Sequence, residues 1–272
     1  MFEKYVEELS TKYSKATIHK TLAIINQTIN YGVTNKELAD IRLLNIKEPK
    51  EDEVRVKKRE QKFISLEDMN LLYDVCYKDV NHIAGLIVVT IMYSGMRINE
   101  ALNLRWCDVS SDYCQIHVKR SSQKLRTRDR DGQFIKKDDG TYVYEYYEKT
   151  PKTASGDRIV PLPKRAQSVL CELDKEQHGK NDYVFRTKDG RQYNYNMMHK
   201  PLKRMIKNAG LQDKDYDFHS LRRGYGSILL SKGVNIAVIS KLLGHSKVSV
   251  TMNVYTKPFD KDVFDAVTKF DE

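Results

Sequence analysis

Several features common in other protein classes are absent from this sequence. It has four cysteines in 272 residues and no C-x-x-C pair, which argues against a disulfide framework or a zinc ribbon. Its longest apolar stretch, 84–93, is too short to cross a bilayer, and its first residues lack the apolar core of a signal peptide. We therefore expect a soluble cytoplasmic protein that has no membrane segment.

Motifs that mark common catalytic cofactors are also missing. The sequence contains no G-x-x-x-x-G-K-[ST] phosphate loop, no H-E-x-x-H zinc motif and no clustered carboxylates of the kind that hold two metal ions. It gives no sign of ATP use or of a bound metal, and we expect no cofactor. Any chemistry is then expected to come from side chains alone.

The balance of charge is basic. The chain has 47 Lys and Arg against 37 Asp and Glu, a net charge of +10 and a pI near 9.2. Because Lys and Arg displace the counterions condensed on phosphates, this balance favours a polyanionic partner such as nucleic acid. On charge alone the alternative is an ordinary basic protein. Hydrophobic residues make up 40% of the chain, which is enough for a packed core.

The hydrophobic pattern predicts two mainly helical parts. Within residues 1–45, apolar side chains recur three or four positions apart from Ile18 to Ile29, as on one helix face. Residues 46–62 hold seven basic and five acidic residues and are predicted to form a charged, solvated linker. A second, larger domain is expected to follow over 63–272.

The second domain is predicted to be mainly α with a small antiparallel β-sheet, an α+β fold. The high apolar density over 80–104 predicts one or two buried helices, the first ending near Gly95. Short β-like runs occur in 106–120 and 158–163. The polar segment between them, 121–150, contains two Asp-Gly turn signals and is predicted to be an elongated hairpin or loop.

The carboxyl-terminal third holds side chains suited to binding and attacking a phosphate. His219 and Arg222 are three residues apart, so they share a face on a helix. Arginine offers a bidentate fork to phosphate oxygens, and histidine can carry a proton near neutrality. Gly244 suits the end of a helix and places His245 at the break, ten residues before Tyr255.

Two upstream segments add further cationic candidates. Arg97 follows directly on the apolar run, and a charge so close to a buried stretch needs a partner or a ligand. Glu100 could be that partner within the protein. Lys152 lies at the start of a turn region, within 150–163.

Taken in order, these residues resemble the tyrosine recombinase (phage integrase) family. The matching sequence motifs are S-G-M-R-I-N-E-A-L, P-K-T followed by R-I-V-P-L, H-S-L-R and L-L-G-H-S. The resemblance covers about 60–272 and, more weakly, 1–45, and it is similar to integrases of phages and conjugative transposons of Gram-positive bacteria. It implies the tyrosine recombinase catalytic fold preceded by a partial helical core-binding domain. The positions that carry it are Arg97, Lys152, His219, Arg222, His245 and Tyr255.

The resemblance implies that part of this set binds the scissile phosphate. Arg97 and Arg222 would clamp the phosphate and stabilise its pentacoordinate transition state. His245 would donate a hydrogen bond to the phosphate. Glu100 would orient Arg97. Fixed hydrogen-bond donors of this kind stabilise the negative charge that develops on the nonbridging oxygens.

The remaining positions would carry the covalent step. By the same resemblance, Tyr255 would attack and form a 3′-phosphotyrosine link, His219 would act as general base or acid, and Lys152 would protonate the leaving 5′ oxygen. Lys149, three residues earlier, is the alternative to Lys152. A covalent intermediate conserves the energy of the phosphodiester bond, so the reaction would need no ATP.

The expected partner is double-stranded DNA. The family works as a homo-tetramer on paired recombination sites, through a Holliday junction, and accessory DNA-bending or excision proteins can take part. The apolar tail 259–270 is expected to dock on the next subunit, with packing on its own domain as the alternative. Basic residues in the linker and in the predicted hairpin are candidate DNA contacts, with a solvated linker and a mobile loop as alternatives: Lys57, Lys58, Arg59, Arg120, Arg126 and Arg128.

The first domain is shorter than the resemblance leads one to expect. Integrases of this kind begin with an arm-binding domain and a complete core-binding domain, and residues 1–45 resemble only the back part of the latter. We therefore expect a site-specific recombinase, shortened at its amino terminus, that integrates or excises a mobile element. The alternatives are a type IB topoisomerase or resolvase-like enzyme acting on one duplex, and a catalytically idle DNA-binding relative.

Overall fold

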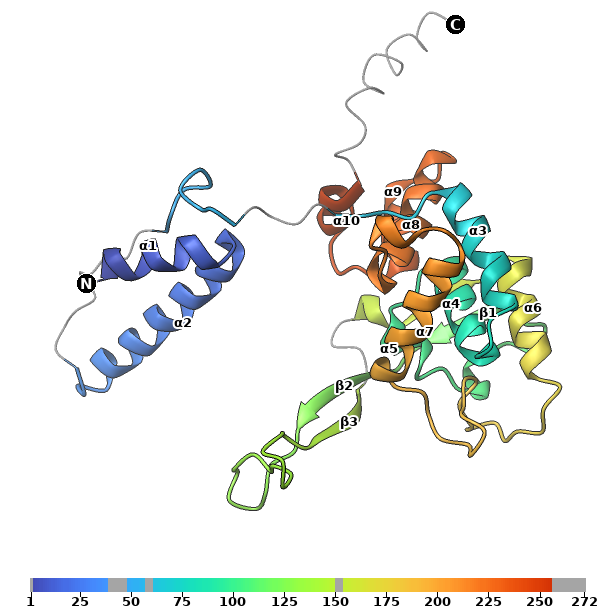
Figure 1. The fold of residues 1–272 in the computed structure, drawn as a ribbon, viewed down its shortest axis with the longest axis horizontal. Coiled ribbons are helices and arrows are strands. Elements are labelled where there is room, and N and C mark those ends of the chain that lie inside the picture. The colour runs from blue at the N-terminus through green and yellow to red at the C-terminus, as the bar shows by residue number, and fades with distance from the viewer. Residues whose placement is uncertain (1, 39–47, 57–60, 150–153, 256–272) are drawn as a thin grey trace, which may run out of the picture. The chain divides into compact units, whose positions relative to one another are not determined.

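The computed structural model describes residues 2–38, 48–56, 61–149 and 154–255. The chain divides into two compact units, residues 1–60 and residues 61–272. Figure 1 labels the helices and strands of both units.

The first unit is built on two helices, α1 (Phe2–Lys12) and α2 (Lys15–Thr34). The predicted helix face is confirmed, because Ile18 and Leu22 are buried and pack with Leu9 of α1. Residues 48–56, which fall within the predicted solvated linker, pack against this pair instead. The side chain of Val54 joins the apolar cluster, and the backbone N–H of Arg55 donates to the carbonyl of Ser10 at 3.0 Å.

The second unit is a helical body with short strands along its side. Its described helices and 3-10 turns are α3 (Leu66–Tyr77), α4 (His82–Ser94), α5 (Ile98–Ala101), η1 (Trp106–Asp108), η2 (Ala154–Gly156), α6 (Lys164–Leu173), α7 (Tyr195–Asn208), η3 (Gln212–Lys214), α8 (Phe218–Ser231), α9 (Ile236–Leu243) and α10 (Val248–Tyr255). Its described strands are β1 (Gln115–Val118), β2 (Ser121–Arg126), β3 (Tyr144–Lys149) and β4 (Arg158–Pro161). The predicted fold class, mainly α with a small amount of antiparallel β structure, is confirmed.

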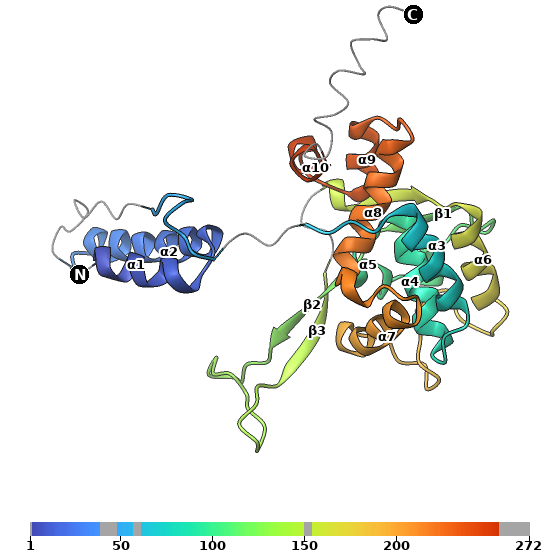
Figure 2. The same ribbon diagram turned by 45° about the horizontal axis from the view of Figure 1, so that its top comes forward.

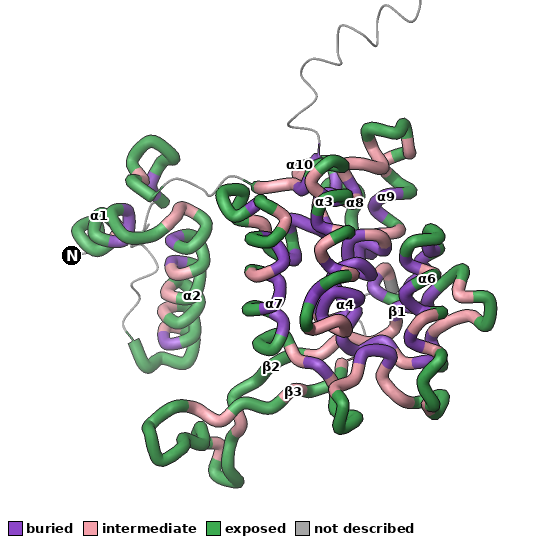
Figure 3. Tube along the Cα trace, turned by 45° about the vertical axis from the view of Figure 1, so that its right-hand side comes forward, coloured by how far each residue is buried: buried purple, intermediate pink, exposed green. Residues whose placement is uncertain are grey.

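The central helix of this body is α4. Nearly every residue from Ala84 to Ser94 is buried, since α3, α6, α7 and α8 pack around it, and Figure 3 shows it as the buried axis of the unit. It ends at Gly95, as the sequence predicted, in the left-handed conformation (φ 64°). A β-carbon there would stand 2.4 Å from the ring of Tyr225, so this close approach requires glycine.

The β structure differs from the single small sheet expected. Among the described residues it forms two separate antiparallel pairs, β1 with β4 and β2 with β3. β1 and β4 lie on the helical body, where Ile116 and Val160 are buried. The β2–β3 pair confirms the predicted elongated hairpin: Ser121 pairs with Lys149 and Arg126 with Tyr144, and Figure 2 shows it extending away from the helices.

No helix in the described part of the chain has both the length and the apolar character needed to cross a membrane.

Candidate active site

The short turn after α4 brings Arg97 and Glu100 together. Arg97 is the N-cap residue of α5, and its backbone N–H donates to Glu100 Oε2 at 2.9 Å. Its guanidinium donates through Nη1 to Glu100 Oε1 at 2.7 Å. The two side chains differ in solvent exposure: that of Arg97 is 41% exposed, whereas that of Glu100 is 6% exposed. Arg97 therefore remains open to a ligand while Glu100 holds it in place.

Arg222 enters the same place from α8. Asp217 caps this helix by accepting from the backbone N–H of Ser220 at 2.6 Å, which fixes where its first turns begin. Arg222 is buried, with its Nη1 2.7 Å from the carbonyl oxygen of Gly95 and 3.9 Å from Glu100 Oε2. His219 lies one turn earlier on α8 and is exposed.

A third arginine, Arg158 of β4, completes the group around Glu100. Its Nη2 donates to Glu100 Oε2 at 2.8 Å and its Nη1 to Oε1 at 3.3 Å. Both side chains are buried. Burial raises the pKa of Glu100, but the hydrogen bonds and charge of Arg158, with the charges of Arg222 and Arg97, outweigh it and lower that pKa to about 2.

The arginines also converge on the carboxyl end of α9. The carbonyls at a helix end lack intrahelical partners and carry partial negative charge. Here three consecutive ones are used: Leu242 accepts from Arg158 Nε at 2.7 Å, Leu243 from Arg222 Nη2, and Gly244 from Arg97 Nη2 at 3.5 Å. The three guanidiniums thus share one carboxylate and one helix end.

This arrangement leaves an excess of positive charge. Three guanidiniums surround a single carboxylate, so two positive charges remain for a ligand, and the site is built to hold an anion. Burial, together with the neighbouring charge of Arg97, lowers the pKa of Arg222, and Glu100 opposes that shift. An anionic ligand at the exposed edge of Arg97 would relieve the repulsion between the cations.

His245 follows the α9 turn directly. Gly244 is left-handed (φ 66°), as the sequence predicted for a helix end, and a β-carbon on it would stand 2.8 Å from both Arg158 Nη1 and the carbonyl oxygen of Ser155. His245 Nδ1 lies 2.8 Å from Thr251 Oγ1 on α10, and Thr251 is buried. Burial and the charges of Arg222 and Arg97 lower the pKa of His245 to about 4, so its imidazole is neutral at pH 7.

Tyr255 is the last residue of α10 and is 2% exposed. Its ring packs with Leu243 and meets Phe63 edge-on, with 5.9 Å between ring centroids. Its hydroxyl points at α8, where a β-carbon on Gly226 would stand 2.4 Å from the oxygen. Burial raises the pKa of Tyr255 to about 12, against the opposing charges of Arg222 and Arg223.

The structure therefore brings together Arg97, Glu100, Arg222 and His245. Lys152, the linker residues Lys57, Lys58 and Arg59, and the tail 259–270 lie outside the described residues.

The predicted DNA contacts of the hairpin fall into two kinds. Arg120, at its base, is paired with Asp108 and Glu148 of the protein. Arg126 and Arg128 lie farther out and stack over the ring of Phe134, at 5.3 and 4.0 Å from its centroid. The outer pair presents a basic, aromatic surface, whereas Arg120 stabilises the hairpin itself.

Arg158 is the site residue that sequence reasoning missed. A signal for it existed, because β4 alternates buried and exposed residues and Arg158 shares the buried face with Val160. A cation on the inward face of a strand needs an acidic partner. Its partner is 58 residues away in the chain, at Glu100, where local spacing gives no hint.

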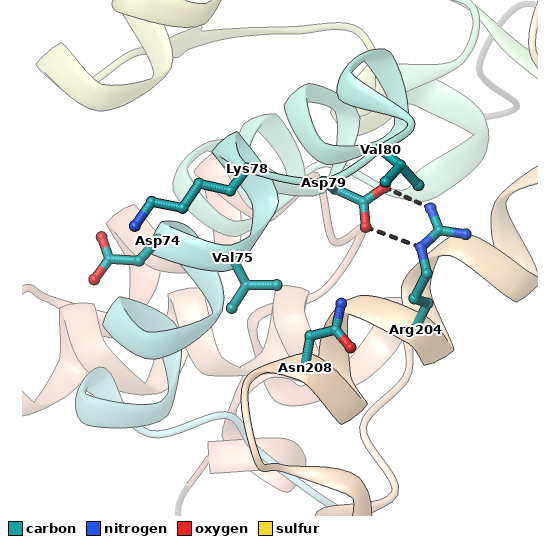
Figure 4. A pocket seen from close by; sticks show the side chains of 7 residues that line it. All are labelled: Asp74, Val75, Lys78, Asp79, Val80, Arg204 and Asn208. Atoms are coloured by element: carbon teal, nitrogen blue, oxygen red, sulfur yellow. Dashed lines mark hydrogen bonds and ion pairs between the residues drawn. The ribbon is translucent and has the colours of Figure 1, made fainter.

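A pocket elsewhere in this unit is separate from these residues. It is lined by the end of α3, the turn after it and α7, and it contains the ion pair of Asp79 with Arg204 (Figure 4). None of its lining residues belongs to the arginine cluster.

Comparison with known proteins identifies the family. Residues 62–262 match the model of the phage integrase family. The chain belongs to this family. The prediction from the sequence motifs is therefore confirmed.

Several curated relatives carry related names. A XerC-like tyrosine recombinase of Caldanaerobacter subterraneus is 29% identical over 64% of this chain and 45% of its own length. A tyrosine recombinase of Thermosipho africanus is 25% identical over 94% of this chain and 76% of its own length. Transposase A from transposon Tn554 of Staphylococcus aureus is 25% identical over 80% of this chain and 54% of its own length. The chain thus spans about half the length of two of these relatives.

Solved structures of phage integrase relatives have the same fold. A Tn1549 transposon integrase in complex with circular intermediate DNA matches with a TM-score of 0.73 and 15% identity, over 98% of this chain and 85% of that one. XerH recombinase bound to its difH substrate matches with a TM-score of 0.64 and 19% identity, over 99% and 70% of the two chains. At these identities the likeness concerns the fold.

Proposed function

We propose that this protein is a site-specific DNA recombinase that cleaves and rejoins DNA through a 3′-phosphotyrosine intermediate at Tyr255, without metal or ATP. The observation that carries the proposal is the cluster of Arg97, Arg158 and Arg222 around the single carboxylate of Glu100. Its excess positive charge suits one phosphodiester. The relatives named as tyrosine recombinases and the DNA-bound structures of the same fold support it.

The proposed phosphate site uses donors that differ in access. Arg97, with its exposed edge, would bind a nonbridging oxygen, and Arg222 would stabilise the same phosphate from beneath. His245, neutral at pH 7, would donate one hydrogen bond. Preorganised donors of this kind stabilise the charge that develops on the nonbridging oxygens in the transition state.

In the proposed step, the Tyr255 oxygen attacks phosphorus and the bond from phosphorus to the 5′ oxygen breaks. His219 takes the phenolic proton, and Lys152 gives a proton to the leaving 5′ oxygen. A phenol with a pKa of about 12 requires such a base near neutral pH. Attack by a 5′ hydroxyl of another strand reverses the step and joins the two strands.

The proposed assembly is a homo-tetramer on paired sites that proceeds through a Holliday junction and moves a mobile element. Helices α1 and α2, as a core-binding domain within 1–45, would add DNA contacts. Lys57, Lys58 and Arg59 would follow the phosphates from the linker, and the tail 259–270 would dock on the next subunit. Accessory DNA-bending or excision proteins would set the direction of the reaction.

The test is covalent capture from a pool of duplexes that carry a nick and a randomised central sequence. The nick releases a short strand after cleavage, so a protein–DNA adduct persists on a denaturing gel and its DNA can be sequenced. The parent protein is expected to form this adduct, and Tyr255→Phe to form none. The matched control is Tyr195→Phe, which removes the hydroxyl of a half-exposed tyrosine on α7.

The outcomes separate the rival functions. An adduct that survives Tyr255→Phe would identify the wrong nucleophile. Enrichment of bound DNA without any adduct would indicate an idle DNA-binding protein. With two copies of the enriched sequence on a plasmid, exchange of the intervening segment indicates a recombinase, whereas relaxation of supercoils alone indicates an enzyme of the type IB topoisomerase kind.

A further inference from the structure

The Arg158 guanidinium is almost entirely occupied by the protein itself. Nε donates to the carbonyl of Leu242 at 2.7 Å, Nη1 reaches Gly156 O at 3.4 Å as well as Glu100 Oε1, and Nη2 donates to Glu100 Oε2. Arginine has five N–H groups, and these contacts use four of them. The residue is 6% exposed. Arg158 is thus unsuited to binding DNA, in contrast to the exposed Arg97.

These contacts join three separate segments of the candidate site. Through Glu100, Arg158 holds α5, whose N-cap residue is Arg97. Through Leu242 and its close packing on Gly244, it holds the turn that leads to His245. Through Gly156, it holds η2, which follows directly on the segment that contains Lys152.

We propose that Arg158 is a positioning residue that sets Arg97 and His245 for the phosphate by locking Glu100 to the carboxyl end of α9. The proposal rests on the proposed function, since it assigns how that site is held. Arg158 takes both oxygens of Glu100, so the carboxylate cannot turn toward Arg222, which stays 3.9 Å away. Arg222 then keeps its charge available to the phosphate.

The geometry explains why this residue is arginine. A planar fork can bridge two carboxylate oxygens while Nε points in another direction, to the Leu242 carbonyl. A lysine would supply the same charge from one point and could not span these acceptors. Arg158→Lys therefore keeps the charge and removes the geometry, which makes it the informative substitution.

The experiment compares Arg158→Lys with Arg191→Lys in the covalent capture assay. Arg191 is 81% exposed and pairs with Asp189 on a surface turn, so its substitution controls for the change of residue type. For Arg158→Lys we expect capture at saturating protein to slow about 100-fold, the effect of misplacing groups around a reacting centre. Half-saturation should remain within about threefold of the parent, because Arg158 makes no DNA contact. Arg191→Lys should match the parent in both.

A second measurement needs no DNA. Titration of the His245 imidazole by NMR in the free protein reports the environment that Arg158 maintains. In Arg158→Lys the turn is expected to loosen and His245 to become more hydrated, so it should titrate at a higher pH than in the parent. Circular dichroism checks that the variant is folded. Arg158→Gln, which removes the charge as well as the planar fork, should shift the titration at least as far.

Each result decides something. Capture by Arg158→Lys at the parent rate would overturn the proposal while leaving the recombinase function intact. A loss that appears only as weaker half-saturation would also overturn it, since Arg158 would then be a DNA contact. If the parent itself forms no Tyr255-dependent adduct, the proposed function fails, and the His245 titration alone decides whether Arg158 positions this residue: an unchanged titration contradicts it.

Discussion

Gly226 lies directly against the hydroxyl of Tyr255. A β-carbon on Gly226 would stand 2.4 Å from the hydroxyl oxygen and 2.6 Å from the carbon that bears it. This contact fixes the buried position of the tyrosine on the side of α8. Helix propensity and packing therefore have opposite effects on the stability of a variant with alanine in place of this glycine.

Gly226→Ala is expected to destabilise the protein by about 1–3 kcal/mol, the usual cost of overpacking a filled site. Helix propensity alone would predict stabilisation of up to about 1 kcal/mol in the interior of α8. Urea denaturation measures the sign. Gly179→Ala serves as the control, since a β-carbon there meets only ordinary contacts, at 3.5 Å and beyond. A stabilised Gly226→Ala variant would mean that Tyr255 does not rest against α8.

The lowered pKa of His245 predicts a pH dependence of stability. Folding holds this imidazole neutral down to about pH 4, whereas in the unfolded chain it binds a proton near pH 6.5. Between these values the unfolded state binds more protons, so the free energy of unfolding should fall as the pH falls, by on the order of 2 kcal/mol. Above pH 6.5 both states are neutral and this contribution is fully present.

The measurement compares urea denaturation of the parent and His245→Asn from pH 7 to pH 4. The variant is expected to lose less stability across this window than the parent does. His199→Asn, which replaces an exposed histidine on α7, is the control and should follow the parent. Parallel curves for the parent and His245→Asn would show that His245 protonates freely in the folded protein.

The outer hairpin predicts a salt-dependent DNA contact. Replacing Arg126 and Arg128 with Gln is expected to weaken DNA binding across sequences alike. The slope of log affinity against log salt should become shallower by about one to two, or about one per lost phosphate contact. The control removes the same charge from the exposed turn residues Lys188 and Arg191. Equal slopes for the two double variants would indicate that the hairpin contacts something other than DNA phosphates.

The choice between Lys152 and Lys149 predicts a difference in leaving-group chemistry. Lys149 donates one of the three N–H groups of its ammonium to Gln123 across the hairpin, which holds its side chain on the hairpin. Lys152→Met is expected to slow covalent capture about 100-fold or more, the usual share of a general acid. A duplex with sulfur at the bridging 5′ position should restore the rate, since a thiolate leaves without a proton. Lys149→Met should behave as the parent on both substrates; the opposite pattern would assign the acid to Lys149.

The sequence predicted those features that depend on short spacing. The break at Gly95, the turn at Gly244 and the pairing of Arg97 with Glu100 involve residues at most a few positions apart, and local periodicity and capping rules determine them. The hairpin was predictable because the polar segment 121–150 contains two Asp-Gly turn signals, although the segment itself carries no β-like pattern.

Other features depend on contacts between distant parts of the chain. Arg158 finds Glu100 across 58 residues, and neither residue's neighbours reveal the other. The strands form two pairs because β1 pairs with β4 and not with the hairpin. Both β1 and β4 pack on the helical body, a contact between distant parts of the chain. The segment 48–56 has the composition of a linker, yet contacts with α1 and α2 hold it to the first unit. They are the packing of Val54, the backbone bond of Arg55 to Ser10, the hydrogen bond of Glu48 with His19 and the ion pair of Glu51 with Lys15.

The carboxyl end of α9 helps to position three guanidiniums, because each of them donates to a main-chain oxygen there: that of Leu242, Leu243 or Gly244. Because the groups that are recognised are main-chain atoms, the partly buried Leu242 can be substituted without removing them, whereas Gly244 has no room for a β-carbon and Leu243 is buried. A substitution at Leu242 would therefore not reveal that its carbonyl oxygen accepts from Arg158. Lengthening or shortening the turn by one residue would displace these acceptor oxygens, and with them the guanidiniums of Arg97, Arg158 and Arg222. This part of the protein therefore has to preserve the length of the turn as well as the glycine at position 244.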